Sequence, residues 1–360
     1  LCIEINEYSD DKQYASCNLA SISLPAFVKK RENGEVYYDF DELHMITQVV
    51  IRNLNKVIDT SYYSMDEIKK PNLVMRPLGL GVQGLADVFF MMKYPFESKE
   101  AAELNRQIAE TMYHAALTSS MLISKKRHEL LDEYENIETS MDRKQQIEKY
   151  LMLTDEEKEL KEYRGAYAKF VGSPAYYGKL QYDLWGATPS DKYDWTLLKS
   201  EIAKYGIRNS LLIAYMPTAS SSQILGNYES FEPVTSNVFV RDTLAGNFII
   251  PNKYLISDLI RLGLWNNDMK DKLIAENGSV QNIPEIPDDI KQLYKTVYEI
   301  KQKAIMDMSA SRGAYVCQSQ SLNIYIPDTD MNRLSNIHFY GWKVGLKTGS
   351  YYTRVLQAVR

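Results

Sequence analysis

A thiol and a carboxylate stand two residues apart at the start of the chain, as Cys2 and Glu4. Side chains alternate along an extended backbone, so these two would point to the same side. A sulfur beside a carboxylate suits hydrogen abstraction or nucleophilic attack with a general base next to it. A second thiol, Cys17, follows fifteen positions later, near enough to return across a hairpin. A buried cysteine is more often a small apolar residue, so the pair alone does not establish chemistry.

A hydroxyl-rich turn follows a segment that reads as a buried strand, residues 210–215. The turn leads into a predicted helix. Backbone N–H groups at a helix N-terminus are unpaired and the helix dipole favours an anion, so the turn is a candidate phosphate site. An ordinary helix cap explains the same hydroxyls equally well. The candidate residues are Pro217, Thr218, Ala219, Ser220 and Ser221.

Two adjacent tyrosines, Tyr351 and Tyr352, could pass an electron hole and a proton between them. The pair is not distinctive by itself, because the chain has 27 tyrosines. Three other adjacent pairs occur, namely Tyr37-Tyr38, Tyr62-Tyr63 and Tyr176-Tyr177.

Three glycines, Gly79, Gly81 and Gly84, have the G-x-G-x-x-G spacing of a dinucleotide-binding loop. That loop must follow a strand, but the residues before it include Lys69, Lys70 and Pro71, a poor strand. The sequence therefore favours a glycine-rich helix packed tightly against a neighbour. A nicotinamide-dependent dehydrogenase is kept as an alternative.

Hydrophobic spacing predicts the elements that would position these residues. Residues 126–163 are highly charged and predict a helical hairpin that stands out from the body and has no catalytic role. Helices are expected at 41–59, 99–125, 195–205 and 253–262 and within 284–311, and strands at 22–28, 237–250 and 322–326.

Composition restricts the classes of function. The 360 residues carry a net charge of -5, which argues against a surface that coats nucleic acid. No apolar run reaches the length of a membrane span. Three cysteines and four scattered histidines give no disulfide framework and no metal-binding spacing. We therefore expect a protein of a reducing compartment, the cytoplasm, that acts on a small molecule.

Several long motifs together resemble one family, the large subunit of class I ribonucleotide reductase in its eukaryotic and large-DNA-virus form. They are Leu1–Ile5 with 15–21, then 76–87, 172–185, 216–233 and 338–352. The resemblance implies an α/β fold, the second half of a ten-stranded α/β barrel with the catalytic finger loop at its N-terminus. It divides the chain into 1–125 (finger loop and first part of the half-barrel), the charged insertion 126–163, and 164–360 (the remainder).

The resemblance also implies the reaction, reduction of ribonucleoside diphosphates to 2′-deoxyribonucleoside diphosphates. Cys2 would become a thiyl radical that abstracts the ribose 3′-hydrogen, while Glu4 takes the 3′-hydroxyl proton. Cys17 would be one of two reducing thiols that end as a disulfide. Tyr352 and Tyr351 would carry the radical to Cys2. The substrate would be held by Leu1, Pro217, Thr218, Ala219, Ser220 and Ser221.

The implied partners lie outside this segment, which would bind no cofactor or metal directly. A metal-containing small subunit would supply the radical, and a thioredoxin- or glutaredoxin-type protein the electrons. A missing N-terminal half would carry the second reducing cysteine and the ATP and dNTP effector sites. Since the chain starts inside a motif without Met and ends without a thiol pair, we expect it to be inactive alone. Cys317 is expected to be structural.

Two further alternatives remain open. An adenosylcobalamin or glycyl-radical reductase would share the barrel and the thiyl cysteine, but would not need Tyr351 and Tyr352. A half-barrel without catalytic activity would serve only as a binding module.

Overall fold

Parallel strands form the centre of the fold in the computed structural model, which describes residues 3–137, 141–153, 162–244, 246–328 and 330–356. Strand β1 (Leu19–Ser23) pairs with β4 (Gly79–Gln83) in parallel. The ladder continues to residues 211–216, where the N–H of Leu80 donates to the carbonyl oxygen of Leu212 at 2.9 Å.

The next two segments extend the ladder in the same direction. The N–H of Ser321 donates to the carbonyl oxygen of Tyr215 at 2.9 Å, which adds residues 318–322. The chain then runs into β7 (Ile324–Ile326), which pairs in parallel with β8 (Thr353–Val355). Five parallel segments thus lie side by side, and the predicted α/β class is confirmed.

The glycine-rich segment is a strand, so the predicted helix is wrong. All five residues of β4 are buried. A strand buried on both faces shows no alternation of polar and apolar residues, which removes the usual signal. A Cβ on Gly81 would lie 2.5 Å from the sulfur of Met216 and 2.9 Å from the carbonyl oxygen of Ala214, so glycine permits this close approach. Gly84, with φ +80°, turns the chain into α3 (Leu85–Met92).

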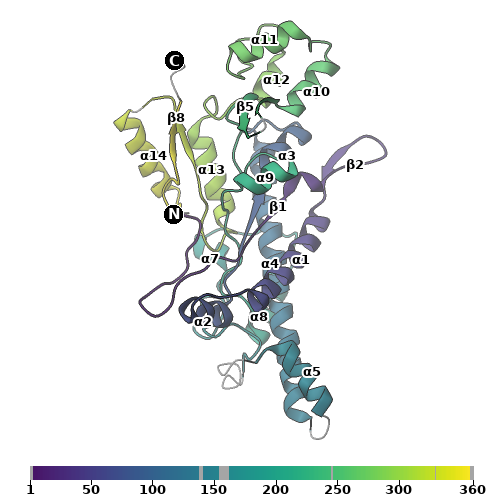
Figure 1. The fold of residues 1–360 in the computed structure, drawn as a ribbon, viewed down its shortest axis with the longest axis vertical. Helices are drawn as coiled ribbons and strands as arrows, with labels where there is room; N and C mark the ends of the chain where they lie inside the picture. The colour runs from purple at the N-terminus through teal and green to yellow at the C-terminus, as the bar shows by residue number, and fades with distance from the viewer. Residues whose placement is uncertain (1–2, 138–140, 154–161, 245, 329, 357–360) are drawn as a thin grey trace.

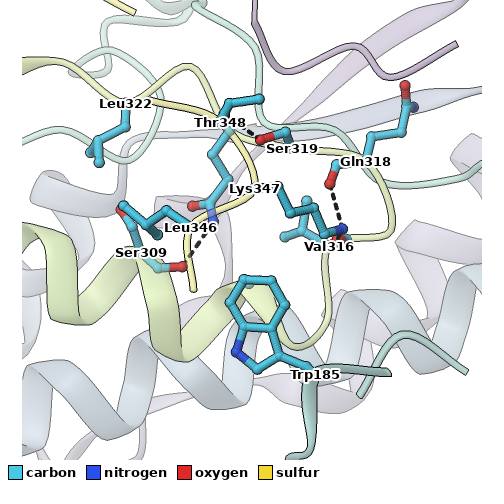
Figure 2. A pocket seen from close by; sticks show the side chains of 11 residues that line it. Trp185, Ser309, Val316, Gln318, Ser319, Leu322, Leu346, Lys347 and Thr348 are labelled. Carbon is cyan, nitrogen blue, oxygen red and sulfur yellow. Dashed lines mark hydrogen bonds between the residues drawn. The ribbon is translucent and has the colours of Figure 1, made fainter. Parts of the chain in front are cut away.

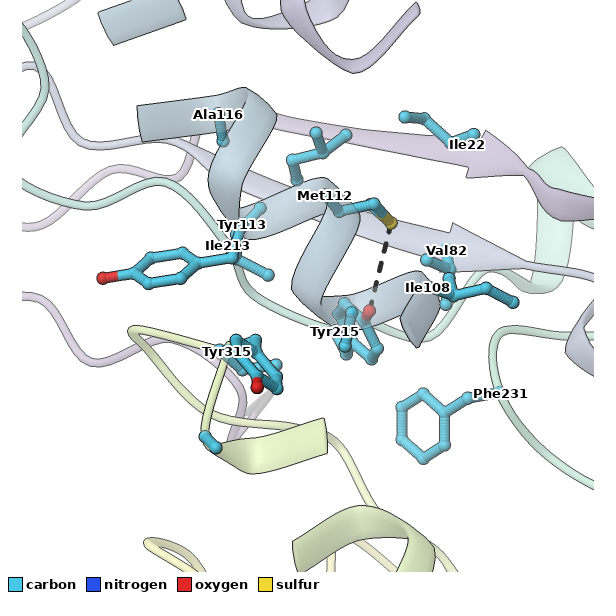
Figure 3. Packing of buried hydrophobic residues seen from close by; sticks show 14 of the residues in the cluster. Ile22, Val82, Ile108, Met112, Tyr113, Ala116, Ile213, Tyr215, Phe231 and Tyr315 are labelled. Atoms are coloured by element: carbon cyan, nitrogen blue, oxygen red, sulfur yellow. Dashed lines mark hydrogen bonds between the residues drawn. The ribbon is translucent and has the colours of Figure 1, made fainter. Parts of the chain in front are cut away.

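Helices pack against this ladder, and the longest is α4 (Lys99–Asn136). It lies along α1 (Phe40–Thr60) and α8 (Trp195–Tyr205), which confirms helices predicted at 41–59 and 195–205. The helix predicted at 99–125 runs 11 residues further. In the core shown in Figure 3, Met112 of α4 meets Tyr215 of the ladder, with the hydroxyl 4.0 Å from the sulfur.

Two predicted elements differ from the structure. The strand expected at 22–28 ends at Ser23, because a short 3₁₀ helix, η1 (Leu24–Phe27), follows with Pro25 in its first turn. The long helix expected within 284–311 is two separate helices. These are α12 (Asp288–Leu293) and α13 (Gln302–Gly313).

The charged insertion forms a helical hairpin, as predicted. The end of α4 packs against α5 (Met141–Leu151) through Leu130, Leu131, Ile147 and Leu151. The hairpin lies at the opposite end of the molecule from α10 (Lys253–Arg261), α11 (Asn267–Ala275) and α12 (Figure 1). Part of the predicted hairpin, residues 138–140 and 154–161, lies outside the described residues.

The remaining elements complete the periphery. None of the described helices has both the length and the apolar character needed to cross a membrane. The hairpin of β5 and β6 confirms the strands expected within 237–250, and α10 confirms the helix expected at 253–262. The peripheral elements are α2 (Asp66–Met75), α7 (Gln181–Trp185), α9 (Ala219–Leu225), α10 (Lys253–Arg261), α11 (Asn267–Ala275), α14 (Met331–Lys343), β2 (Val28–Lys30), β3 (Val36–Tyr38), β5 (Val238–Thr243) and β6 (Gly246–Pro251).

A histidine pair joins α1 to α4. The Nε2 atom of His44 lies 2.9 Å from Nδ1 of His114, and Tyr193 stacks on both rings. One nitrogen of this contact must lack a proton for the hydrogen bond to form. Burial lowers the pKa of His114 to about 4, and it also lowers the pKa of His44. The pair is therefore held in its neutral form.

We predict that Gly81→Ala lowers the free energy of unfolding by about 1–3 kcal/mol, because the new methyl group overpacks the contact with Ala214 and Met216. Gly349→Ala is the matched control, since nothing lies within 4 Å of its added Cβ. Urea unfolding of both variants measures the difference. Equal stability of the two variants would contradict the close packing of β4.

We predict that stability falls with acidification because of His114. Its pKa is lower in the folded chain than in the unfolded chain, so the folded state binds fewer protons between about pH 6.5 and 4. The stabilisation is present above pH 6.5 and is lost as the pH falls, on the order of 2 kcal/mol by pH 5. Urea unfolding across this range should show a shallower slope for His114→Gln. The exposed His338→Gln should keep the wild-type slope.

Candidate active site

The N-terminal loop lies against the strand at residues 318–321. The carbonyl oxygen of Glu4 accepts from the N–H of Ser319 at 2.9 Å, and the Asn6 N–H donates to Oε1 of Gln318 at 3.1 Å. The Glu4 side chain is 1% exposed, and its carboxylate accepts from the hydroxyl of Ser321. A buried carboxylate needs such donors, so this contact fixes where the carboxylate lies.

The structure describes one of the two thiols proposed for chemistry, Cys17. Cys2 and Leu1 lie outside the described residues. Ile3 and Glu4 lie in a turn and not in an extended segment, and the orientation of Cys2 relative to Glu4 stays a prediction. Cys17 is exposed and stands directly before Asn18 and β1. Pairing of these thiols stays a prediction.

The hydroxyl-rich turn ends the ladder segment 211–216 and begins the short helix α9. Thr218 is buried, and its hydroxyl oxygen accepts from the N–H of Ser230 at 2.7 Å. It therefore makes no side-chain cap on α9, which disfavours the ordinary-cap explanation. Ser220 and Ser221 are exposed beside the first turn of the helix. The turn offers N–H groups and hydroxyls at the edge where ligands of parallel sheets usually bind.

A polar network that the sequence did not reveal lies at the carboxyl ends of β1 and β4. The Gln83 amide donates to the Ser21 hydroxyl at 2.8 Å. The Asn227 amide donates to the Ser23 hydroxyl at 2.7 Å and to Oε1 of Gln83 at 3.3 Å. The network links both strand ends to the loop after α9. The available signal was a glutamine at the end of an otherwise apolar strand.

The tyrosine pair is hydrogen-bonded to the segment that also binds Glu4, residues 318–326. The ring centroids of Tyr351 and Tyr352 are 4.2 Å apart. The N–H of Tyr351 donates to the carbonyl oxygen of Leu322 at 2.7 Å, and the N–H of Ile324 donates to the carbonyl oxygen of Tyr352 at 2.8 Å. Tyr352 is 48% exposed, while Tyr351 is partly buried. The pair thus runs from the surface towards the ladder.

The loop before the tyrosines is tied to this strand by two side chains (Figure 2). The Nζ atom of Lys347 donates to the carbonyl oxygens of Val316, Cys317 and Gln318 at 2.8, 3.0 and 2.6 Å. Burial lowers the pKa of Lys347. The hydroxyls of Thr348 and Ser319 are 2.6 Å apart. Both contacts hold the tyrosine segment in register with the strand.

Cys317 contacts the neighbouring strand. Its sulfur accepts from the N–H groups of Leu212 and Ile213, both at 3.2 Å. These contacts agree with the structural role expected for this cysteine. Among the described residues, no group of three or more His, Cys, Asp or Glu side chains could hold a metal ion.

Known proteins resemble this chain along its whole length. Residues 1–352 match the family described as "Ribonucleotide reductase, barrel domain". The ribonucleoside-diphosphate reductase large chain of Cryptosporidium parvum is 51% identical over all of this chain and 40% of its own length. The large chain of Schizosaccharomyces pombe is 49% identical over 99% of this chain and 39% of its own length. The chain thus spans about two fifths of these relatives.

A solved structure shows the same fold. The class Id ribonucleotide reductase alpha subunit of Actinobacillus ureae superposes with a TM-score of 0.67. The match covers 99% of this chain and 53% of that subunit, at 23% sequence identity.

We predict that Ser321→Ala lowers the free energy of unfolding by about 1–3 kcal/mol, because it removes a donor to the buried carboxylate of Glu4. In the Glu4→Gln background the same change should cost less, since no charge remains to be solvated. A double-mutant cycle with urea unfolding measures the coupling. Additive effects would contradict a direct Ser321–Glu4 interaction, and the exposed Ser220→Ala is the neutral control.

Proposed function

The chain belongs to the ribonucleotide reductase barrel family, and we propose that it forms the second catalytic half-barrel of a ribonucleoside-diphosphate reductase large subunit. One observation carries the proposal beyond sequence similarity. The strand that binds Glu4 through Ser319 and Ser321 also binds Tyr351 through Leu322. The proposed reaction site and the proposed radical entry therefore share one strand.

The reaction proposed is the reduction of ribonucleoside diphosphates to 2′-deoxyribonucleoside diphosphates. Cys2, as a thiyl radical, takes the 3′-hydrogen of the ribose, and Glu4 takes the 3′-hydroxyl proton. Loss of the 2′-hydroxyl as water is balanced by two electrons and protons from two thiols, which become a disulfide. Cys17 is one of these thiols, and a thioredoxin- or glutaredoxin-type protein restores them.

The substrate diphosphate is assigned to the turn at residues 217–221. The N–H groups of the first turn of α9 have no side-chain cap, and Ser220 and Ser221 add exposed hydroxyls. Leu1 is also assigned to substrate binding, although it lies outside the described residues. Fixing both ends of the substrate holds its 3′-carbon at near-contact distance from Cys2, which hydrogen abstraction requires.

The radical is proposed to enter through Tyr352 and pass to Tyr351. The 4.2 Å ring separation permits transfer within the pair, and the exposure of Tyr352 permits delivery from another subunit. A small subunit that contains a metal supplies this radical. ATP and dNTP effectors are assigned to the part of the large subunit outside this chain.

The alternatives are less well supported. Gly79 and Gly81 lie inside a buried strand, where the space for a Cβ is already filled, so they leave no room for a pyrophosphate. This geometry disfavours a nicotinamide-dependent dehydrogenase. An adenosylcobalamin-dependent reductase would give no reason for the binding of the tyrosine pair to the Glu4 strand. A binding module without activity would give no reason for the buried carboxylate of Glu4.

We predict that Cys2→Ser and Tyr352→Phe each lower deoxynucleotide formation on the order of a thousandfold or more, because each removes a group that must carry the radical. The assay uses the complete large subunit with its radical-generating partner and scores the 2′-deoxy product. Tyr62→Phe, at a 91% exposed tyrosine, is the matched control. Normal turnover by Cys2→Ser would overturn the proposed function. Normal turnover by Tyr352→Phe alone would favour a reductase with another radical source.

A further inference from the structure

The carboxylate of Glu232 lies outside the proposed reaction site and is bound to β7, the strand next to β8. Glu232 follows α9 in the chain and is partly buried. Its carboxylate accepts from the hydroxyl of Tyr325 at 2.5 Å and from the side-chain amide of Asn323. Both donors are themselves buried; Tyr325 lies on β7, and Asn323 directly precedes this strand. Hydrogen bonds from two buried groups hold this carboxylate in one place.

The tyrosine pair directly precedes the neighbouring strand, β8. Tyr325 is paired with Arg354 across the parallel ladder of β7 and β8. Directly paired residues of a parallel ladder point to the same face, so Tyr325 and Arg354 share a face. The carboxylate of Glu232 is bound on this common face.

Arg354 connects the carboxylate to the outer tyrosine. Its guanidinium carbon lies 5.4 Å from the centroid of the Tyr352 ring, within range of a cation–π interaction. Arg354, Glu232 and Tyr325 line one cavity of about 620 Å³. The positive charge of Arg354 also favours the ionised form of Glu232. The anchored carboxylate therefore shares a cavity with an exposed arginine that contacts Tyr352.

We propose that Glu232 is a positioning residue for radical entry: anchored by Tyr325 and Asn323, its carboxylate attracts Arg354 and so holds the ring of Tyr352. This inference rests on the proposed role of the tyrosine pair. It assigns to Glu232 no contact with substrate. Loss of the Glu232 carboxylate should therefore lower kcat and leave substrate binding unchanged.

The attraction depends on pH through the charge on Glu232. Burial raises the pKa of this carboxyl, although the hydrogen bonds from Tyr325 and Asn323 oppose the rise. Other charges face it from three directions. They are Glu229 on the same loop, Arg354 on β8 and Arg312 on α13. As the pH falls through the raised pKa, Glu232 becomes neutral and releases Arg354.

The test compares Glu232→Gln with Glu229→Gln, the same chemical change at an exposed residue of the same cavity. In the complete large subunit with its radical-generating partner, we expect Glu232→Gln to lower kcat about ten- to a hundredfold with KM unchanged. The fall in kcat towards acidic pH should also be absent from this variant. Glu229→Gln should behave like wild type at neutral pH.

A second variant keeps the test decisive if Glu232→Gln folds poorly. Arg354 is exposed, so Arg354→Gln should fold normally and give the same loss of kcat. Wild-type kcat in both variants, while Tyr352→Phe is inactive, would overturn this inference and leave the proposed function standing. Full activity of Tyr352→Phe would instead overturn the proposed radical entry itself. A rise in KM with unchanged kcat would also contradict a positioning role for Glu232.

Discussion

The segment 318–326, which ends in β7, is the constraint on which the site depends. Its backbone is bonded to the segment 211–216 on one side and to β8 on the other. At its start it also binds the N-terminal loop through Ser319 and Ser321. A strand with two backbone neighbours has little freedom to slide, because a shift by one residue would turn every side chain to the opposite face. Segments far apart in the sequence are thereby given fixed relative positions.

Close packing of the ladder explains why two glycines are required within it. A methyl group at Gly81 would collide with the carbonyl oxygen of Ala214, which is backbone and cannot move aside. The glycines therefore allow neighbouring strands to pack closely and do not bind a ligand. The same buried environment removed the alternation that identifies a strand, so the sequence suggested a helix there. The amphipathic helices α1 and α8 carried a clear 3.6-residue pattern and were predicted almost to the residue.

The residues of the candidate site also differ in whether a local sequence pattern reveals them. Glu4, the turn at 217–221 and the tyrosine pair could be selected from the sequence, because each is a local cluster of reactive or polar residue types. Gln83, Asn227 and Glu232 could not be, because their partners come from distant strands whose register no local pattern encodes. The sequence predicted a helix to residue 125 and a separate helical hairpin from 126, whereas α4 continues unbroken to Asn136. Its last turns pack against α5, a contact that no local pattern encodes.

Glu4 and Tyr351 contact consecutive residues of the segment 318–326. Ser321, which binds the Glu4 carboxylate, and Leu322, which binds the Tyr351 backbone, are consecutive residues. Their Cα atoms are therefore about 3.8 Å apart, whatever else in the molecule moves. Transfer of a radical to a substrate-bound site depends steeply on distance and orientation. The proposed general base and the proposed inner tyrosine are thus hydrogen-bonded to adjacent residues of one segment, which limits how far they can move apart. In this proposal only the exposed outer tyrosine is left to be held by side chains such as Arg354.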